Sequence, residues 1–234
     1  MKTSSCAVFT EGLASENRPR HFCPRALRGG ALPCGAVFYL FSKRFFDLLF
    51  SAVALLFLWP LLLALAIWVR LDSDGPALYR QTRVGKNGRE FEVLKFRTMS
   101  IAAEMESGPV WAVKNDTRIT RAGHILRKLY LDELPQLINV VKGEMSLVGP
   151  RPERPFFYPL LEKEIPGFSR RCCVQPGLTG LAQVRQCHQA SLGAVQRKFT
   201  YDIFYLRHRG FGFDLYIIWK TIDRVYLEFK EVLR

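Results

Sequence analysis

The chain has 234 residues, of which 49% are hydrophobic and 24% are charged. That composition excludes a disordered chain, which is poor in apolar residues, and a collagen-like chain, which has glycine at every third position. Lysine and arginine (34) outnumber the acidic residues (21), and the formal net charge is +13. This excess predicts a polyanionic partner: a nucleic acid, an anionic lipid or a phosphorylated substrate.

The N-terminal part of the chain is rich in Ser, Gly, Pro and Arg and has no sustained hydrophobic period. We expect residues 1–42 to form a poorly ordered basic tail. Its apolar residues come too late for a secretory signal peptide. The six cysteines form no Cys-x-x-Cys pair. We therefore expect reduced thiols rather than a metal or disulfide framework.

An uncharged run from Leu48 to Val69 follows, and it is apolar on all sides rather than along one stripe. It is long enough for a membrane segment, which needs about 20 apolar residues. Pro60 lies near its middle and predicts a kink, and neither arm alone crosses a hydrocarbon core of ~30 Å. Basic residues flank both ends, which favours the cytoplasmic side for both. The residues predict a membrane segment over 43–71 and leave a re-entrant and a spanning helix both open.

After the turn cluster Asp72-Ser73-Asp74-Gly75-Pro76, the pattern becomes that of a globular domain. We expect two short strands, at 77–81 and 90–95, around a turn at Gly85–Gly88. Helical spacing predicts four helices, at 123–130, from 134 to a stop at Gly143, at 196–206 and at 213–233. Stiff loops are expected at 149–152 and 175–180. The last helix has an apolar face that suits either the core or a lipid interface.

The stretch Leu131–Gln136 is the most informative about chemistry. Pro135 is typical of a first helical turn, which places Asp132 at or near the N-cap and Glu133 in the first turn. One interpretation is that Asp132 only caps the helix, a contribution of ~1 kcal/mol. The functional interpretation is that one carboxylate attacks phosphorus while its neighbour holds a divalent metal ion.

Basic residues lie near this carboxylate pair in the sequence. They are Lys95, Arg97, Arg127 and Arg151. Pro150 and Pro152 restrict the backbone around Arg151, so its guanidinium is preorganised to hold a phosphate with two hydrogen bonds. The alternative is that Arg151 pairs with a nearby carboxylate, such as Glu153. Two glycines in the loop Pro176–Gly180 would let backbone amides approach a ligand, although a plain turn has the same sequence.

The order of these motifs resembles that of the bacterial sugar transferase family, the monotopic polyprenyl-phosphate phosphoglycosyl transferases. The matching stretches are Lys43–Asp47, Leu94–Met99, Asp116–Arg121, Leu131–Leu137, Lys142–Glu153, Pro176–Gln183, and Lys198 with Tyr201-Asp202. The resemblance covers about residues 43–230. It is greatest to members that act in exopolysaccharide assembly.

The resemblance implies transfer of a sugar 1-phosphate from a UDP-sugar to polyprenyl phosphate, with release of UMP. It implies that Asp132 is the nucleophile of a covalent phosphosugar intermediate, that Glu133 binds Mg²⁺ (or Mn²⁺), and that Arg97, Arg127 and Arg151 lie near the phosphates. We expect further substrate contacts from Lys95, Pro150, Pro152, Gly177, Thr179, Gly180, Gln183, Lys198 and Asp202.

The resemblance also implies an architecture: a re-entrant membrane helix hairpin over 43–71, broken at Trp59-Pro60 where the family has Ser-Pro. A small cytosolic catalytic domain over 72–234 follows, of the α/β class (α+β, mostly helical), with short strands and interfacial helices. The expected partners are a UDP-sugar, polyprenyl phosphate and the lipid bilayer, without nucleic acid, and a homo-oligomer is left open. The expected place is the cytoplasmic face of a bacterial inner membrane.

Two other classes of protein remain as alternatives. A membrane-tethered basic module that binds nucleic acid or anionic lipid without catalysis explains the charge and the apolar run. It does not explain Asp132-Glu133 or Pro150-Arg151-Pro152. A spanning glycosyltransferase that binds metal through Asp72-Ser73-Asp74 is the other alternative, although we expect that stretch to be a solvated turn.

Overall fold

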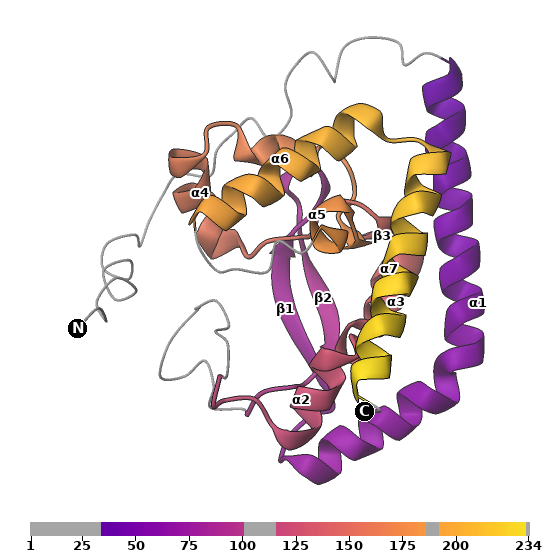
Figure 1. Cartoon of the computed structure of the whole chain (residues 1–234), viewed down its shortest axis with the longest axis vertical. Helices are drawn as coiled ribbons and strands as arrows, with labels where there is room; N and C mark the ends of the chain where they lie inside the picture. The colour runs from indigo at the N-terminus through magenta and orange to yellow at the C-terminus, as the bar shows by residue number, and fades with distance from the viewer. Residues whose placement is uncertain (1–33, 101–115, 186–191, 233–234) are drawn as a thin grey trace.

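One long helix, α1 (Cys34–Asp72), carries the apolar run and begins before the expected boundary at residue 43. It begins earlier because the apolar residues 36–41 extend the run toward the N-terminus. The computed structural model describes residues 34–100, 116–185 and 192–232, so most of the expected tail lies outside the described residues. Pro60 is inside α1, where a proline removes a backbone hydrogen bond and kinks the helix. Figure 1 shows α1 following one side of the molecule and then bending across the bottom of the view.

The middle of α1 is not covered by the rest of the protein. Leu56, Phe57 and Trp59 expose 68%, 76% and 59% of their surface. Among the helices of the described residues, α1 is the one that is long and apolar enough to cross a membrane. Apolar side chains exposed over this length indicate a lipid or protein partner, and they exclude a buried core helix.

The predicted strand pair is present. Strand β1 (Leu78–Val84) pairs antiparallel with β2 (Glu90–Phe96), and Tyr79 lies opposite Lys95. A short 3₁₀ turn, η2 (Lys86–Gly88), joins them. Strand β1 extends further than expected because Val84, at its end, packs in a buried cluster with Phe157, Tyr158 and Phe168.

A second, two-stranded sheet was not predicted. Strand β3 (Ser146–Val148) pairs in parallel with β4 (Gly177–Thr179), where the sequence predicted a loop. The strand was missed because three residues are too few to show a period of two. Gly177 is required at this contact, because a Cβ there would lie 2.1 Å from the Gly149 amide nitrogen. The pairing holds the two expected loops against each other, and the Gly177 amide donates to the Pro150 carbonyl at 2.9 Å.

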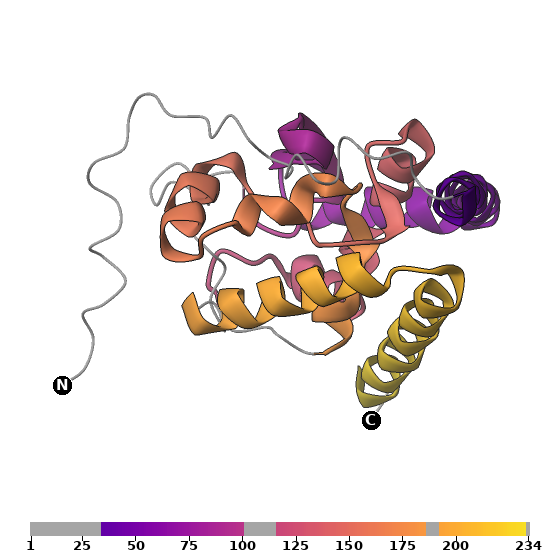
Figure 2. The ribbon, with the colours of Figure 1, turned by 90° about the horizontal axis from the view of Figure 1, so that it is seen from above.

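Helices make up most of the remaining domain. In chain order the elements are α2 (Arg121–Lys128), η4 (Leu131–Glu133), α3 (Gln136–Lys142), η5 (Pro155–Phe157), α4 (Tyr158–Glu164), η6 (Phe168–Cys173), α5 (Leu181–Val184), α6 (Leu192–His208) and α7 (Phe211–Val232). The four predicted helices correspond to α2, α3, α6 and α7. Figures 1 and 2 place α1 and α7 on one side of the molecule and α4 on the other.

Both ends of α1 contact this one domain. Near the N-terminal end, Arg44 donates to the carbonyls of Val140 and Val141 in the last turn of α3, at 2.6 and 2.9 Å. Near the C-terminal end, Leu65 and Val69 pack in a buried cluster with side chains of β2 and α2. The two arms of α1 therefore both contact the same domain, at different places.

Asn139 joins β2 to α3 from the buried interior. Its Oδ1 accepts a hydrogen bond from the Leu94 amide at 3.0 Å, and its Nδ2 donates to the Glu92 carbonyl at 2.7 Å. Satisfied buried amides fix geometry because the alternative is an unpaired polar group. Lys95 follows Leu94 in β2, so this contact also fixes the position of Lys95 relative to α3 and to the Asp132-Glu133 pair that precedes α3.

Asp214, in the first turn of α7, ties three helices together. Its carboxylate accepts hydrogen bonds from Tyr39 (2.9 Å) and Lys43 (2.8 Å) of α1 and from Tyr205 (2.8 Å) of α6. Further along α7, one face is exposed and apolar, formed by Leu215, Trp219, Ile222 and Tyr226. Of the two predicted roles for this face, its exposure excludes the core.

We expect Asp214→Asn to destabilise the protein by about 3 kcal/mol, because it leaves the Lys43 ammonium largely buried without its countercharge. Thermal unfolding in detergent micelles measures the effect. Asp223→Asn on the same helix is the matched control. Its ion pair with Lys220 is 3.4 Å long and well exposed, so its loss should cost less than ~1 kcal/mol. Equal losses in both variants would contradict a structural role for Asp214.

Candidate active site

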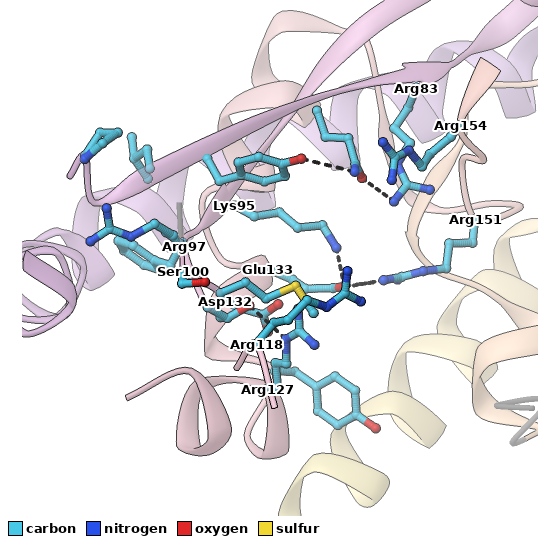
Figure 3. A pocket seen from close by; sticks show the side chains of 18 of the residues that line it. Arg83, Lys95, Arg97, Ser100, Arg118, Arg127, Asp132, Glu133, Arg151 and Arg154 are labelled. Atoms are coloured by element: carbon cyan, nitrogen blue, oxygen red, sulfur yellow. Dashed lines mark hydrogen bonds and ion pairs between the residues drawn. The ribbon is translucent and has the colours of Figure 1, made fainter. Parts of the chain in front are cut away.

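A polar cavity of about 550 Å³ lies between the β1–β2 sheet, η4 and the loop after β3. Asp132 and Glu133 line it, and Figure 3 shows basic side chains around them. The basic lining residues are Arg83, Lys95, Arg97, Arg118, Arg127, Arg151 and Arg154. Seven cations against three carboxylates, those of Asp132, Glu133 and Glu153, leave a net positive cavity, which suits an anionic ligand.

The carboxylate pair lies on η4, not at the start of α3. Pro135 has no N–H to donate to the carbonyl of Leu131, so the α-helical hydrogen bonds begin only after it, and α3 starts at Gln136. Tyr130, with a φ of 56°, turns the chain from α2 into η4. The expectation that Asp132 is an N-cap is therefore wrong: it lies inside a separate 3₁₀ turn and is 8% exposed.

Glu133 is held by two cations from different elements. Lys95 of β2 donates to its Oε1 at 3.0 Å, and Arg151 donates to both of its oxygens, to Oε2 at 3.2 Å. Burial by itself would raise the pKa of Glu133, but Arg151 and Lys95 outweigh burial and hold the pKa well below its usual range. Glu133 therefore stays ionised at every pH at which the protein works.

Asp132 has the opposite electrostatic environment. Burial, with the charge of Glu133 beside it, raises the pKa of Asp132 to about 6, against the opposing influence of Lys95, Arg127 and Arg151. No salt bridge within the described residues reaches Asp132, whereas two reach Glu133. Figure 3 shows Arg127 beside Asp132, and its Nε donates to the Thr98 hydroxyl at 2.8 Å. The arrangement presents an ionisable oxygen to the cavity at neutral pH without a bonded cation.

Arg97 lines the cavity, but its guanidinium is bonded to backbone carbonyls. Its guanidinium donates to the carbonyls of Val69, Ser73 and Asp74 at 3.3, 2.6 and 2.5 Å. These carbonyls belong to the end of α1 and the turn that follows it, so Arg97 fixes the exit of α1. In the same turn, Asp72 accepts a hydrogen bond from the Ala122 amide at 2.9 Å, at the start of α2. Hydrogen bonds to the protein itself explain this turn, which weakens the alternative of an Asp-x-Asp metal site.

The loop that carries Arg151 is held from behind by a buried ion pair. Arg171 donates to the Arg151 carbonyl at 2.6 Å and pairs with Asp202 at 2.7 Å, and the side chains of both partners are at most 5% exposed. Asp202, expected at the substrate, thus lies behind the loop. The alternative that Arg151 pairs with a nearby carboxylate holds for Glu133 and not for Glu153, which pairs with Arg83 at 3.7 Å.

The other expected residues lie away from Asp132. Thr179, Gln183 and Lys198 line a second cavity of about 580 Å³, which also has Glu133 and Arg151 in its wall. The backbone of Gly177 pairs with the loop of Pro150, and Pro152 accepts a hydrogen bond from Arg83 at 3.0 Å. Gly180 packs against Gly149, where a Cβ would lie 2.2 Å from the Gly149 carbonyl oxygen.

Three arginines of the polar cavity were missed in the sequence. They are Arg83, Arg118 and Arg154. Arg83 was detectable, because the alternation of a strand places it on the same face as Tyr79, which lies opposite Lys95. Arg118 donates to Asp116 at 2.8 and 2.6 Å, a pair that no periodicity predicts. Arg83 and Arg118 each pair with a carboxylate, Glu153 and Asp116, so their charges are largely compensated.

The residues present fit a magnesium ion only together with a substrate. No group of three or more His, Cys, Asp or Glu side chains that could hold a metal occurs in the described part of the chain. Mg²⁺ is usually held by one or two carboxylates, waters and substrate phosphates. Asp132 and Glu133 supply that number of carboxylates, although both oxygens of Glu133 are already bonded to cations.

A comparison with known proteins identifies the family. The family model for the bacterial sugar transferase matches residues 38–228. This chain belongs to the bacterial sugar transferase family. The family predicted from the motifs is thereby confirmed, and the match includes the whole polar cavity of this sugar transferase.

Similar proteins carry names of related activities. Over 84% of its length, the sugar transferase is 40% identical to an Aeromonas hydrophila protein named UDP-N-acetylgalactosamine-undecaprenyl-phosphate N-acetylgalactosaminephosphotransferase, and covers 46% of that protein. It is 41% identical to a UDP-glucose:undecaprenyl-phosphate glucose-1-phosphate transferase of Xanthomonas campestris, over 80% of this chain and 39% of the relative. An exopolysaccharide production protein of Rhizobium leguminosarum is 42% identical, over 78% of this chain and 94% of the relative. The chain thus spans less than half the length of the first two relatives.

The buried carboxylate of Asp132 should make the sugar transferase less stable at alkaline pH. A pKa raised from 3.8 to about 6 means that the folded state binds the proton more tightly than the unfolded chain. The stability this gives is present below pH ~4 and is lost as the pH rises through 6. Asp132→Asn stays neutral, so it should stabilise the fold at pH 8 by up to about 3 kcal/mol.

Thermal unfolding in detergent at several pH values measures this effect, with Asp223→Asn as the control. The gain of Asp132→Asn should shrink as the pH falls from 6 toward 4. A variant that is no more stable than the wild type at pH 8, or one whose gain is independent of pH, would contradict the raised pKa.

Proposed function

We propose that this chain transfers a sugar 1-phosphate from a UDP-sugar to polyprenyl phosphate and releases UMP, as an initiating step of exopolysaccharide or other surface glycan assembly. The names of the relatives, which pair UDP-sugars with undecaprenyl phosphate, support this substrate class. The observation that carries the proposal is the electrostatic division of the carboxylate pair. Asp132 is buried and has no salt bridge to any described residue, while Glu133 is neutralised by Lys95 and Arg151.

The division suits a two-step displacement at phosphorus. In the first step an ionised Asp132 oxygen attacks the phosphorus that bears the sugar, and the bond from that phosphorus to the bridging oxygen breaks. UMP leaves with the electron pair, and the phosphosugar remains on Asp132 as an acyl phosphate. In the second step an oxygen of polyprenyl phosphate attacks the same phosphorus, and Asp132 leaves as a carboxylate.

Cations are needed because an anion attacks an anion in both steps. Lys95, Arg127 and Arg151 lie around the carboxylates, and oriented cations in a site of low dielectric stabilise the negative charge that gathers on the phosphoryl oxygens. We propose that Glu133, with the phosphates of the substrate, holds Mg²⁺ (or Mn²⁺). When bound, such an ion supplies further neutralisation of the phosphates.

The membrane segment is proposed to be re-entrant, which places the catalytic domain at the cytoplasmic face of a bacterial inner membrane. The support is that both arms of α1 contact the same domain, through Arg44 and through Val69, while the apolar middle is exposed. A helix that enters and leaves one leaflet holds the site at the headgroup plane, where a polyprenyl phosphate carries its phosphate. Each basic residue near anionic headgroups adds about 1 kcal/mol to the association.

The non-catalytic alternative, a basic module tethered to the membrane, has no specific observation in its favour. Binding of an anionic lipid or a nucleic acid needs exposed cations, and it gains nothing from two carboxylates beneath the cations. Asp132 in particular would repel such a ligand when ionised, and its burial costs stability. A buried, ionisable oxygen in a basic cavity is instead typical of a nucleophile.

We expect Asp132→Asn to lose at least about 10³-fold in turnover, because an amide does not attack phosphorus. Wild-type protein in nanodiscs, mixed with a UDP-sugar labelled with ³²P at the sugar-bearing phosphate and then quenched, should retain label on the polypeptide. Asp132→Asn should retain none, and Asp223→Asn should retain as much as the wild type. Label that persists on Asp132→Asn, or a wild type that never carries label, would refute the proposed nucleophile.

A further inference from the structure

A second cavity of about 580 Å³ adjoins the polar one and is mostly apolar. It lies among η4, β4, α5 and α7, and its apolar wall includes Leu134, Leu178, Val184, Ile218 and Val225. Glu133 and Arg151 line both cavities. Tyr130 and Glu153 line both as well, so these four residues separate the two cavities, while Asp132 lines only the polar one.

The lining of this second cavity combines charged side chains with an exposed apolar one. Arg151 is joined there by Lys198 and by Arg171, which donates to the Arg151 carbonyl and pairs with Asp202, and the carboxylates of the lining are Glu133 and Glu153. Ile222 of α7 also lines the cavity and is 63% exposed. Ile222 belongs to the exposed apolar face of α7 described above. The cavity thus has more cations than carboxylates in its lining and borders an apolar surface.

We propose that this second cavity binds the polyprenyl phosphate acceptor, with the phosphate at Arg151 and the first isoprene units against Leu178, Val184 and Val225. The inference rests on the proposed function and deepens it by assigning each substrate its own cavity. A long-chain alkenyl phosphate has a phosphate that cationic side chains bind and an apolar chain that an apolar groove binds. The seven basic side chains of the first cavity suit the nucleoside diphosphate, which has two phosphate groups.

The assignment gives the second step a direction. UMP leaves by way of the polar cavity, and the acceptor phosphate reaches the phosphosugar on Asp132 from the side of Arg151. Its oxygen forms the new bond to phosphorus as the bond from phosphorus to the Asp132 oxygen breaks, and the carboxylate takes the electron pair. Because Arg151 borders both cavities, it is placed to contact the phosphates of donor and acceptor in turn.

The test separates the two half-reactions in nanodiscs. Exchange of labelled UMP into the UDP-sugar, without acceptor, reports the first step alone. The apparent KM for polyprenyl phosphate in complete turnover reports the acceptor. Val225→Trp fills the second cavity, and Ile222→Glu places a charge at its exposed mouth without disturbing the core. Leu227→Trp is the control, because Leu227 lies on the same helix, is 54% exposed and lines neither cavity.

Both cavity variants should keep UMP exchange within about twofold of the wild type and raise the KM for polyprenyl phosphate at least tenfold. Leu227→Trp should change neither quantity. If Val225→Trp does not fold, Ile222→Glu decides alone. An unchanged acceptor KM, or a loss of exchange that matches the loss of transfer, would overturn the assignment. A wild type without any UMP exchange would overturn the proposed function itself, which distinguishes the two failures.

Discussion

The ion pairs of Glu133 with Lys95 and Arg151 are the interaction on which the site depends. They neutralise one of two adjacent carboxylates and leave the other, Asp132, buried with a raised pKa. Without the two cations, burial and mutual repulsion would raise the pKa of both carboxyl groups, and the pKa of Glu133 would not lie so far below that of Asp132. The ion pairs also join β2, η4 and the loop after β3 at one point, so the same contacts that set the charges fix the shape of the cavity.

The surrounding fold positions those cations. Asn139 links β2 to α3 and so places Lys95, while Arg171 and Asp202 support the backbone of Arg151 from behind. Asp214 and Arg44 attach the N-terminal arm of α1 to the opposite side of the domain. A buried polar network of this kind is costly to disturb. Some of its members, such as Arg171 and Asp202, are charged side chains that do not line the polar cavity.

The sequence predicted the β1–β2 pair, four helices and the residues Asp132, Glu133, Lys95 and Arg151, because period, turn residues and charge are local signals. It placed Asp132 at a helix N-cap, since Pro135 marks a first turn without showing that a separate 3₁₀ turn precedes it. It assigned Asp202 to the substrate, because sequence distance does not show that the side chain of Arg171 lies closer. Arg97 does line the cavity, and its bonds to the carbonyls at the end of α1 were not predicted. Strand β4 was missed because its partner lies far away in the chain.

The measurement that tests the central claim most directly is a carbon-13 NMR titration of the side-chain carboxyl groups in detergent micelles, with the Asp132 signal assigned by its absence in Asp132→Asn. The account predicts that Asp132 titrates near pH 6 and that Glu133 stays ionised down to the lowest pH at which the protein is folded. An Asp132 that titrates near 4, as in an unstructured peptide, or a Glu133 that takes up its proton before Asp132 does, would contradict it.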